Sequence, residues 1–188
     1  MTDDVRFDWS QFRLGIYIQN SPEHLYRLWT TPSGLIRWFL RTAAFAAADG
    51  PPKTPAKAKS LPPYGTLKCR HDDDPCGIGD RYRWEWYYDG GISGEGWIID
   101  VRPPTRLEFT FGDRMEVTVS IRKQGSYSEV DLRQHGIPVN ARARHELHMG
   151  CRQAWTFFLA NLKSVAEGGL DLRETERGKS KQLHLVNI

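Results

Sequence analysis

The sequence contains no apolar run long enough to cross a bilayer, and its first residues lack the charged-then-apolar layout of a signal peptide. We therefore expect a protein without a membrane span, located in the cytoplasm, where its three cysteines stay reduced. Net charge is also slight, because 26 basic and 23 acidic side chains are mixed along the chain and leave a formal charge of +3. The massed positive charge that binds nucleic acid is missing, so we expect no nucleic-acid partner.

Signatures of catalysis and of cofactor binding are missing too. No nucleophile elbow, phosphate-binding loop or dinucleotide fingerprint occurs, so we expect no cofactor. The segment CRHDDDPC places Cys69, His71 and Cys76 around acidic residues, but a structural zinc site needs four ligands at a recurring spacing. The segment HELH spaces His145 and His148 one residue short of the metalloprotease motif. We interpret both segments as polar surface and predict no metal site.

The first part of the chain predicts a strand, two helices and a loop. Residues 11–20 alternate apolar and polar side chains, which is typical of a half-buried strand. Ser21 and Thr31 are N-cap residues, each followed by a proline, and they predict the starts of two short helices. Residues 42–63 are rich in alanine, proline, glycine and lysine. Because prolines exclude a continuous helix or central strand, we predict a long loop there.

Six strands and a helix are predicted after this loop. Turn sequences separate runs with strand periodicity at residues 65–70, 80–89, 92–101, 105–112, 114–123 and 127–135. From Leu147 to Val165 apolar residues recur every three or four positions, which predicts a long amphipathic helix that ends at Gly168 and Gly169. We expect one domain over residues 11–170, preceded by an extension at 1–10 and followed by a polar tail at 171–188.

This order of elements resembles a known family. With the segments SPEHLYRLWTTPSGLIRWFL, GDRYRWEWYYDGGISGEGWIIDVRPPTRLEFTF and GCRQAWTFFLANLKSVAEGG, it is similar to the AHSA-type branch of the START/SRPBCC superfamily over residues 11–173. The resemblance implies an α+β helix-grip fold. Its curved seven-stranded antiparallel sheet would wrap around a long C-terminal helix, with two short helices after strand 1 and a cavity between sheet and helix. Members include ligand carriers, cyclases, resistance proteins and chaperone regulators, so the fold alone selects no function.

The segment YRWEWYYDGG is rich in aromatic rings, and strand alternation predicts which way they face. Tyr82, Trp84, Trp86 and Tyr88 share one face, whereas arginine and glutamate side chains share the other. In a sheet that wraps a helix, we expect the rings inside. The same alternation places on the inner face, toward the helix residues Trp155, Phe158 and Leu162, the side chains of Trp97, Ile99, Val101, Leu107, Phe109, Phe111, Met115, Val117, Val119, Ile121, Val130 and Leu132.

The inner face has two open interpretations. The rings either fill the interior or line a cavity for a small molecule, since ligand pockets are largely apolar with few polar groups. Glu95 and Gln134 share the inner phase, and Glu95 is either a strand-end residue that reaches water or a polar handle for a ligand. Stacking on nucleic-acid bases would need rings that face outward with the arginines, contrary to the alternation. The expected ligand-binding residues are Trp38, Trp84, Trp86, Trp97, Phe109, Phe111, Val117, Gln134, Trp155 and Phe158.

Three functions follow as hypotheses. The first is binding of a small apolar or aromatic ligand between sheet and helix, with the 42–63 loop near the entrance. The second, which the resemblance implies, is regulation of a chaperone ATPase through the outer surface. The third, also implied by the resemblance, is a cyclase- or hydrolase-like enzyme that polarises a polyketide-like ring. Its catalytic candidates are Glu95 and His135, with Gln134 or a tyrosine as further polar groups. His135 lies out of phase with the apolar residues, unless the strand ends or bulges there.

Overall fold

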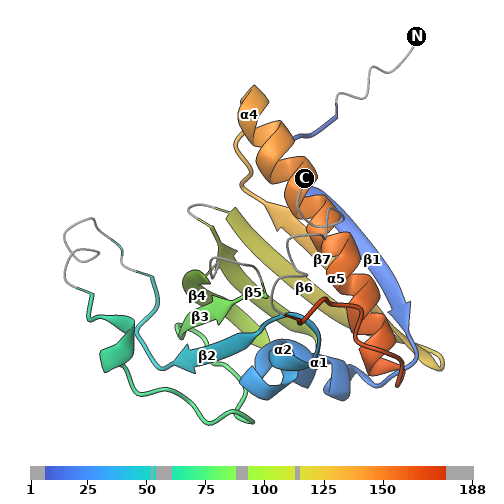
Figure 1. The fold of residues 1–188 in the computed structure, drawn as a ribbon, viewed down its shortest axis with the longest axis horizontal. Coiled ribbons are helices and arrows are strands. Elements are labelled where there is room, and N and C mark those ends of the chain that lie inside the picture. The colour runs from blue at the N-terminus through green and yellow to red at the C-terminus, as the bar shows by residue number, and fades with distance from the viewer. Residues whose placement is uncertain (1–6, 52, 54–60, 88–92, 113–114, 177–188) are drawn as a thin grey trace.

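Within the described part of the chain, seven strands form one curved antiparallel sheet in the order β1-β7-β6-β5-β4-β3-β2 (Figure 1). The computed structural model describes residues 7–51, 53, 61–87, 93–112 and 115–176. The predicted α+β helix-grip architecture is confirmed. Its elements are β1 Phe12–Ile18, α1 Pro22–Thr30, α2 Pro32–Trp38, β2 Thr42–Ala46, η1 Tyr64–Thr66, β3 Arg81–Glu85, β4 Ser93–Arg102, β5 Arg106–Phe111, β6 Met115–Gln124, β7 Tyr127–His135, α4 Ala141–Ala143, η2 Arg144–Met149 and α5 Gly150–Ala166.

The helices α1, α2 and α5 pack on one side of this sheet (Figure 1). The long helix α5 runs beside β1, while α1 and α2 follow β1 directly and contact β6 and α5, respectively. Both short helices begin where predicted, because the side chain of Ser21 accepts a hydrogen bond from the amide of His24 and that of Thr31 accepts one from Gly34. The amide of Asn161 donates to the Trp38 carbonyl over 2.6 Å and ties α5 to α2. No helix in the described part of the chain is long and apolar enough to span a membrane.

The first strand after the short helices differs from the prediction. The loop expected at 42–63 begins as β2, which pairs with β3 and buries Phe45 completely. Residues 65–70 form no strand, since η1 covers their start and Cys69 makes only an isolated bridge to Ala46. The prolines that argued against regular structure begin at Pro51, so the small residues before them are free to pair as an edge strand.

Residues 171–176, the described part of the segment after α5, contact the end of α2. The side chain of Arg173 is only 7% exposed. Its guanidinium donates to the carbonyls of Leu40 and Ile36 over 2.9 and 2.8 Å, at the end of α2. Asp171 holds the same guanidinium and accepts a hydrogen bond from Asn161. Arg173 therefore ties this segment to the end of α2, where it binds carbonyls that the helix leaves free.

A β-bulge in β4 changes which side chains face inward. The register with β5 shifts between Ile98 and Asp100, so Ile99 is an extra residue on β4. Ile98 and Val101 therefore lie opposite Phe109 and Leu107 of the inner face. The prediction that Glu95, Trp97 and Ile99 share the inner phase is wrong. Glu95 and Trp97 lie opposite Arg83 and Arg81 on the outer face.

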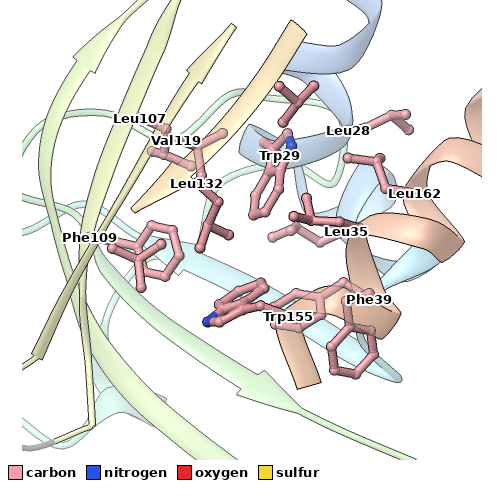
Figure 2. Packing of buried hydrophobic residues seen from close by; sticks show 14 of the residues in the cluster. Leu28, Trp29, Leu35, Phe39, Leu107, Phe109, Val119, Leu132, Trp155 and Leu162 are labelled. Atoms are coloured by element: carbon pink, nitrogen blue, oxygen red, sulfur yellow. The ribbon is translucent and has the colours of Figure 1, made fainter. Parts of the chain in front are cut away.

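The inner face of the other strands follows the prediction. Figure 2 shows Phe109 and Leu132 of the sheet directed toward Trp155 of α5. The buried inner residues of the later strands are Leu107, Phe109, Met115, Val117, Val119, Ile121, Val130, Leu132 and Gln134. On β3, Tyr82 and Trp84 are buried, whereas Tyr88 lies outside the described residues. The rings of Tyr82 and Trp84 stack at 3.9 Å and have room because Gly96 and Gly94 lie opposite them on β4.

We predict that Gly96→Ala lowers the free energy of unfolding by about 1–3 kcal/mol, a typical cost of overpacking. A Cβ at Gly96 would lie 2.5 Å from the Tyr82 ring. That ring cannot move aside easily, because it stacks on Trp84 and its hydroxyl donates to the Thr110 carbonyl over 2.7 Å. Urea unfolding measures the change.

Gly65→Ala is the matched control for Gly96→Ala. A Cβ at Gly65 meets no atom of the described residues within 4 Å. We expect this variant to change the free energy of unfolding by less than about 0.5 kcal/mol. Equal stability of the two variants would contradict close packing between Gly96 and Tyr82.

Candidate functional site

All but one of the expected ligand-binding residues lie on the inner side of the sheet. The exception is Trp97, whose ring contacts the Arg81 guanidinium on the outer face at 5.9 Å. Trp86 and Phe111 are only partly buried. The remaining residues are buried in the core: Trp38, Trp84, Phe109, Val117, Gln134, Trp155 and Phe158.

Phe39 connects these aromatic residues and was missed as a site residue. It follows α2, and its ring stacks on Trp155 at 5.1 Å and meets Phe158 edge-on at 4.8 Å. The rings of Trp84 and Trp86 each lie 5.7 Å from it. The only sequence signal was the Trp-Phe pair after a predicted short helix. Aromatic contacts therefore fill much of the space between β3, α2 and α5.

Gln134 supplies the polar group of this inner site. The Trp155 indole donates to its Oε1 over 2.8 Å, and its own amide nitrogen contacts Met115 Sδ at 3.1 Å. Burial raises the pKa of the neighbouring Cys151 thiol, although a side-chain hydrogen bond with Gln134 opposes that shift. The thiol therefore stays protonated at neutral pH and is a weak nucleophile.

Two buried indole N–H groups of this aromatic core lack a hydrogen-bond partner among the described residues, those of Trp29 and Trp84. An unpaired buried donor of this kind costs about 1–3 kcal/mol of stability. Tyr82 offers no such free group, because its hydroxyl donates to Thr110 and burial raises its pKa.

Eleven partly buried apolar residues among those described pack against this core, and we call five of them the apolar rim. Trp86, Phe111, Leu147, Cys151 and Ala154 are each partly exposed and pack against the buried cluster. Trp86 contacts Phe39, and Phe111 lies 5.6 Å from Trp155. The other three follow one another along η2 and α5. The rim is therefore an accessible edge of the aromatic core.

The two catalytic candidates lie on the other side of the sheet. Glu95 is exposed and forms an ion pair with Arg81. The imidazole Nε2 of His135 lies 3.7 Å from Glu116 and 4.0 Å from Glu108, on strands β6 and β5. Because the sheet separates both candidates from Trp155, neither can act on a molecule held at the inner face.

The two candidate metal segments also have other surroundings than predicted. His148 of HELH is 1% exposed, and its Nδ1 lies 3.0 Å from the Trp9 carbonyl, so the prediction of a surface histidine is wrong. The reason is the π-helical turn η2, which turns His148 toward Phe12 on β1. Cys76 of CRHDDDPC is buried, whereas Cys69 is exposed.

The described residues also border two hollows on the outer face. One has a volume of about 540 Å³ and is lined mainly by charged side chains, including Arg106, Glu108 and His135. The other, of about 370 Å³, is lined by Arg81, Glu95 and Trp97 among others. Neither of these hollows includes a residue of the apolar rim.

A curved sheet that grips a C-terminal helix defines the helix-grip class of proteins. Within this class, the family model for the Activator of Hsp90 ATPase homolog 1-like protein matches residues 19–167. The chain belongs to this family. No curated protein matches the sequence.

Several solved structures share the fold. SSP2350 from Staphylococcus saprophyticus is 11% identical with a TM-score of 0.62, covering 87% of this chain and 96% of its own. The Aha1 dimer from Colwellia psychrerythraea is 16% identical with a TM-score of 0.53, and the match covers 85% of this chain and 97% of that one. DynU16, from the dynemicin biosynthetic locus, is 15% identical with a TM-score of 0.60, covering 88% of this chain and 50% of its own. At these identities the likeness shows the fold alone.

We predict that Gln134→Leu lowers the free energy of unfolding by about 1–3 kcal/mol, because it leaves the buried Trp155 indole without its acceptor. Gln124→Leu, at an exposed position on β6, is the control and should change stability by less than about 0.5 kcal/mol. Urea unfolding of Gln134→Leu alone and in a Trp155→Phe background completes a double-mutant cycle. An equal loss in both backgrounds would show that the two side chains are not coupled.

Proposed function

We propose that the protein binds a small apolar or aromatic molecule at the apolar rim, against Trp155 and Phe39. The observation that carries this proposal is the continuity of partly exposed apolar side chains with a buried aromatic core. Surface patches of this kind are typical of ligand-binding sites, because burial of each Å² of apolar surface contributes about 25 cal/mol. Flat rings would also gain from stacking and edge contacts with the surrounding aromatic residues.

The polar groups nearby favour a ligand with a hydrogen-bond acceptor. The Trp84 indole N–H is unpaired among the described residues and belongs to the same ring cluster as Phe39 and Trp86. A carbonyl or phenol oxygen placed there would satisfy it. Gln134 is engaged by Trp155, so it serves to hold the helix in place rather than to capture the ligand. DynU16 belongs to a biosynthetic locus, which supports a search among small biosynthetic molecules.

The proposed function is binding of the small molecule at the apolar rim, and it includes no chemical reaction. The candidates Glu95 and His135 lie behind the sheet, and burial raises the pKa of Cys151, so no described group at the rim is poised for acid–base or nucleophilic chemistry. Regulation of a chaperone ATPase remains the alternative that the family name suggests. That activity would use the outer surface and would survive a bulky residue at the rim.

We predict saturable quenching of tryptophan fluorescence when hydroxylated anthraquinones or long-chain fatty acids are titrated into the protein. Ala154→Phe should weaken binding at least ~10-fold, because the added ring occupies rim surface that the ligand needs. Phenylalanine is chosen since it adds no tryptophan signal. Native mass spectrometry measures the bound mass independently.

Ala160→Phe is the matched control, because Ala160 is an exposed residue of the same helix outside the rim. It should leave the affinity unchanged. Quenching that does not saturate, or equal loss of affinity in both variants, would contradict a site at the rim. Loss of a chaperone-dependent activity in Ala154→Phe with no ligand bound would instead assign the rim to a protein partner.

A further inference from the structure

Three side chains with metal-binding atoms meet on the outer face of the sheet. Glu108 lies on β5, Glu116 on β6 and His135 at the end of β7. Glu116 is directly paired with His135 in the strand register, and Glu108 is on the adjacent strand. One ligand atom from each residue lies within 4.8 Å of the other two. The antiparallel register therefore assembles a cluster from residues distant in sequence.

The distances in this cluster suit a shared ion. His135 Nε2 lies 3.7 Å from Glu116 Oε2 and 4.0 Å from Glu108 Oε1. Two atoms that each bind one ion at about 2.1 Å in tetrahedral geometry lie about 3.4 Å apart. Small side-chain rotations would close the difference, and the Glu116 side chain is 41% exposed and can make them.

We infer that Glu108, Glu116 and His135 form a binding site for a first-row divalent transition-metal ion. One imidazole with two carboxylates is a donor set that suits Zn²⁺, Mn²⁺ or Co²⁺. The imidazole disfavours Ca²⁺ and Mg²⁺, which prefer oxygen ligands throughout. A divalent ion would also offset the repulsion between the two carboxylates, which lie close together around the imidazole.

A neighbouring arginine orients one of the ligands. Arg106 Nη2 contacts Glu108 Oε2 at 2.5 Å, and its Nε lies 3.3 Å from Asp100. The other oxygen of Glu108, Oε1, is the one nearer His135. Arg106 therefore holds the carboxylate in one orientation, as outer-shell partners do in metal sites.

The outer-face hollow gives such an ion open coordination positions. Glu108 and His135 line this hollow of about 540 Å³, together with Thr118, Ser120 and Arg133. Three protein ligands leave room for water or an oxygen-bearing molecule on the ion. The site lies behind the sheet from the apolar rim, so it does not depend on the proposed function.

Isothermal titration of the chelator-treated 188-residue chain with ZnCl₂ tests the site. We expect one ion per chain with micromolar affinity, and much weaker binding of MgCl₂. His135→Ala and Glu116→Gln should each weaken Zn²⁺ binding by at least ~10-fold, the lower end of the loss seen for outer-shell partners. All three ligand side chains are at least partly exposed, so these variants should remain folded, which circular dichroism checks.

Two control variants separate this site from other sources of binding. Glu129→Gln removes a carboxylate that pairs with Arg122 elsewhere on the outer face, and it should leave Zn²⁺ affinity unchanged. Cys69→Ser tests the exposed thiol of CRHDDDPC and should also have no effect. No binding, binding unchanged in His135→Ala, or equal loss in either control would overturn the proposal.

Discussion

The rest of the structure depends on two interactions of Trp155, its stacking on Phe39 and its hydrogen bond to Gln134. An antiparallel sheet with one apolar face must bury that face against another element, and here α5 provides it. Trp155 stacks on Phe39 beside α2 and donates its indole hydrogen to Gln134 of β7. One side chain thus joins the long helix, the short helices and the sheet, and its hydrogen bond fixes the rotation of α5 about its own axis. The apolar rim exists because this helix orientation leaves Cys151 and Ala154 partly exposed.

The sheet divides the protein into two chemically different sides. On the inner side, glycines on β4 make space for the large rings of β3. A larger residue at these positions would crowd the rings, so the packing depends on glycine there. On the outer side, arginine and carboxylate pairs such as Arg13 with Asp131 and Arg106 with Glu108 cover the strands. The same alternation that buries Val117 therefore exposes Glu116 beside it.

Strand and helix periodicity predicted the elements whose pattern is regular. On β6, β7 and α5, every apolar residue that the strand or helix period placed inside is packed in or against the core. No irregularity interrupts the period within these elements. The errors occur where a local irregularity changes the phase: the bulge at Ile99 moved Trp97 and Glu95 outward, and the π-helical turn moved His148 inward. Neither feature has a reliable sequence signal. Phe39 and the Glu108, Glu116 and His135 cluster could not be found either, since each depends on contacts between elements far apart in the chain.

The anchoring of Arg173 on α2 connects the segment after α5 to the aromatic core. A chain shortened to residue 170 would keep every strand and helix of the described fold. It would nevertheless lose the guanidinium that binds the Ile36 and Leu40 carbonyls on either side of Phe39. The backbone that carries Phe39 would then be held at fewer points, and its ring would stack less firmly on Trp155. The segment after α5 thus helps to hold Phe39 in place, so the packing of the aromatic core depends on residues beyond the last helix.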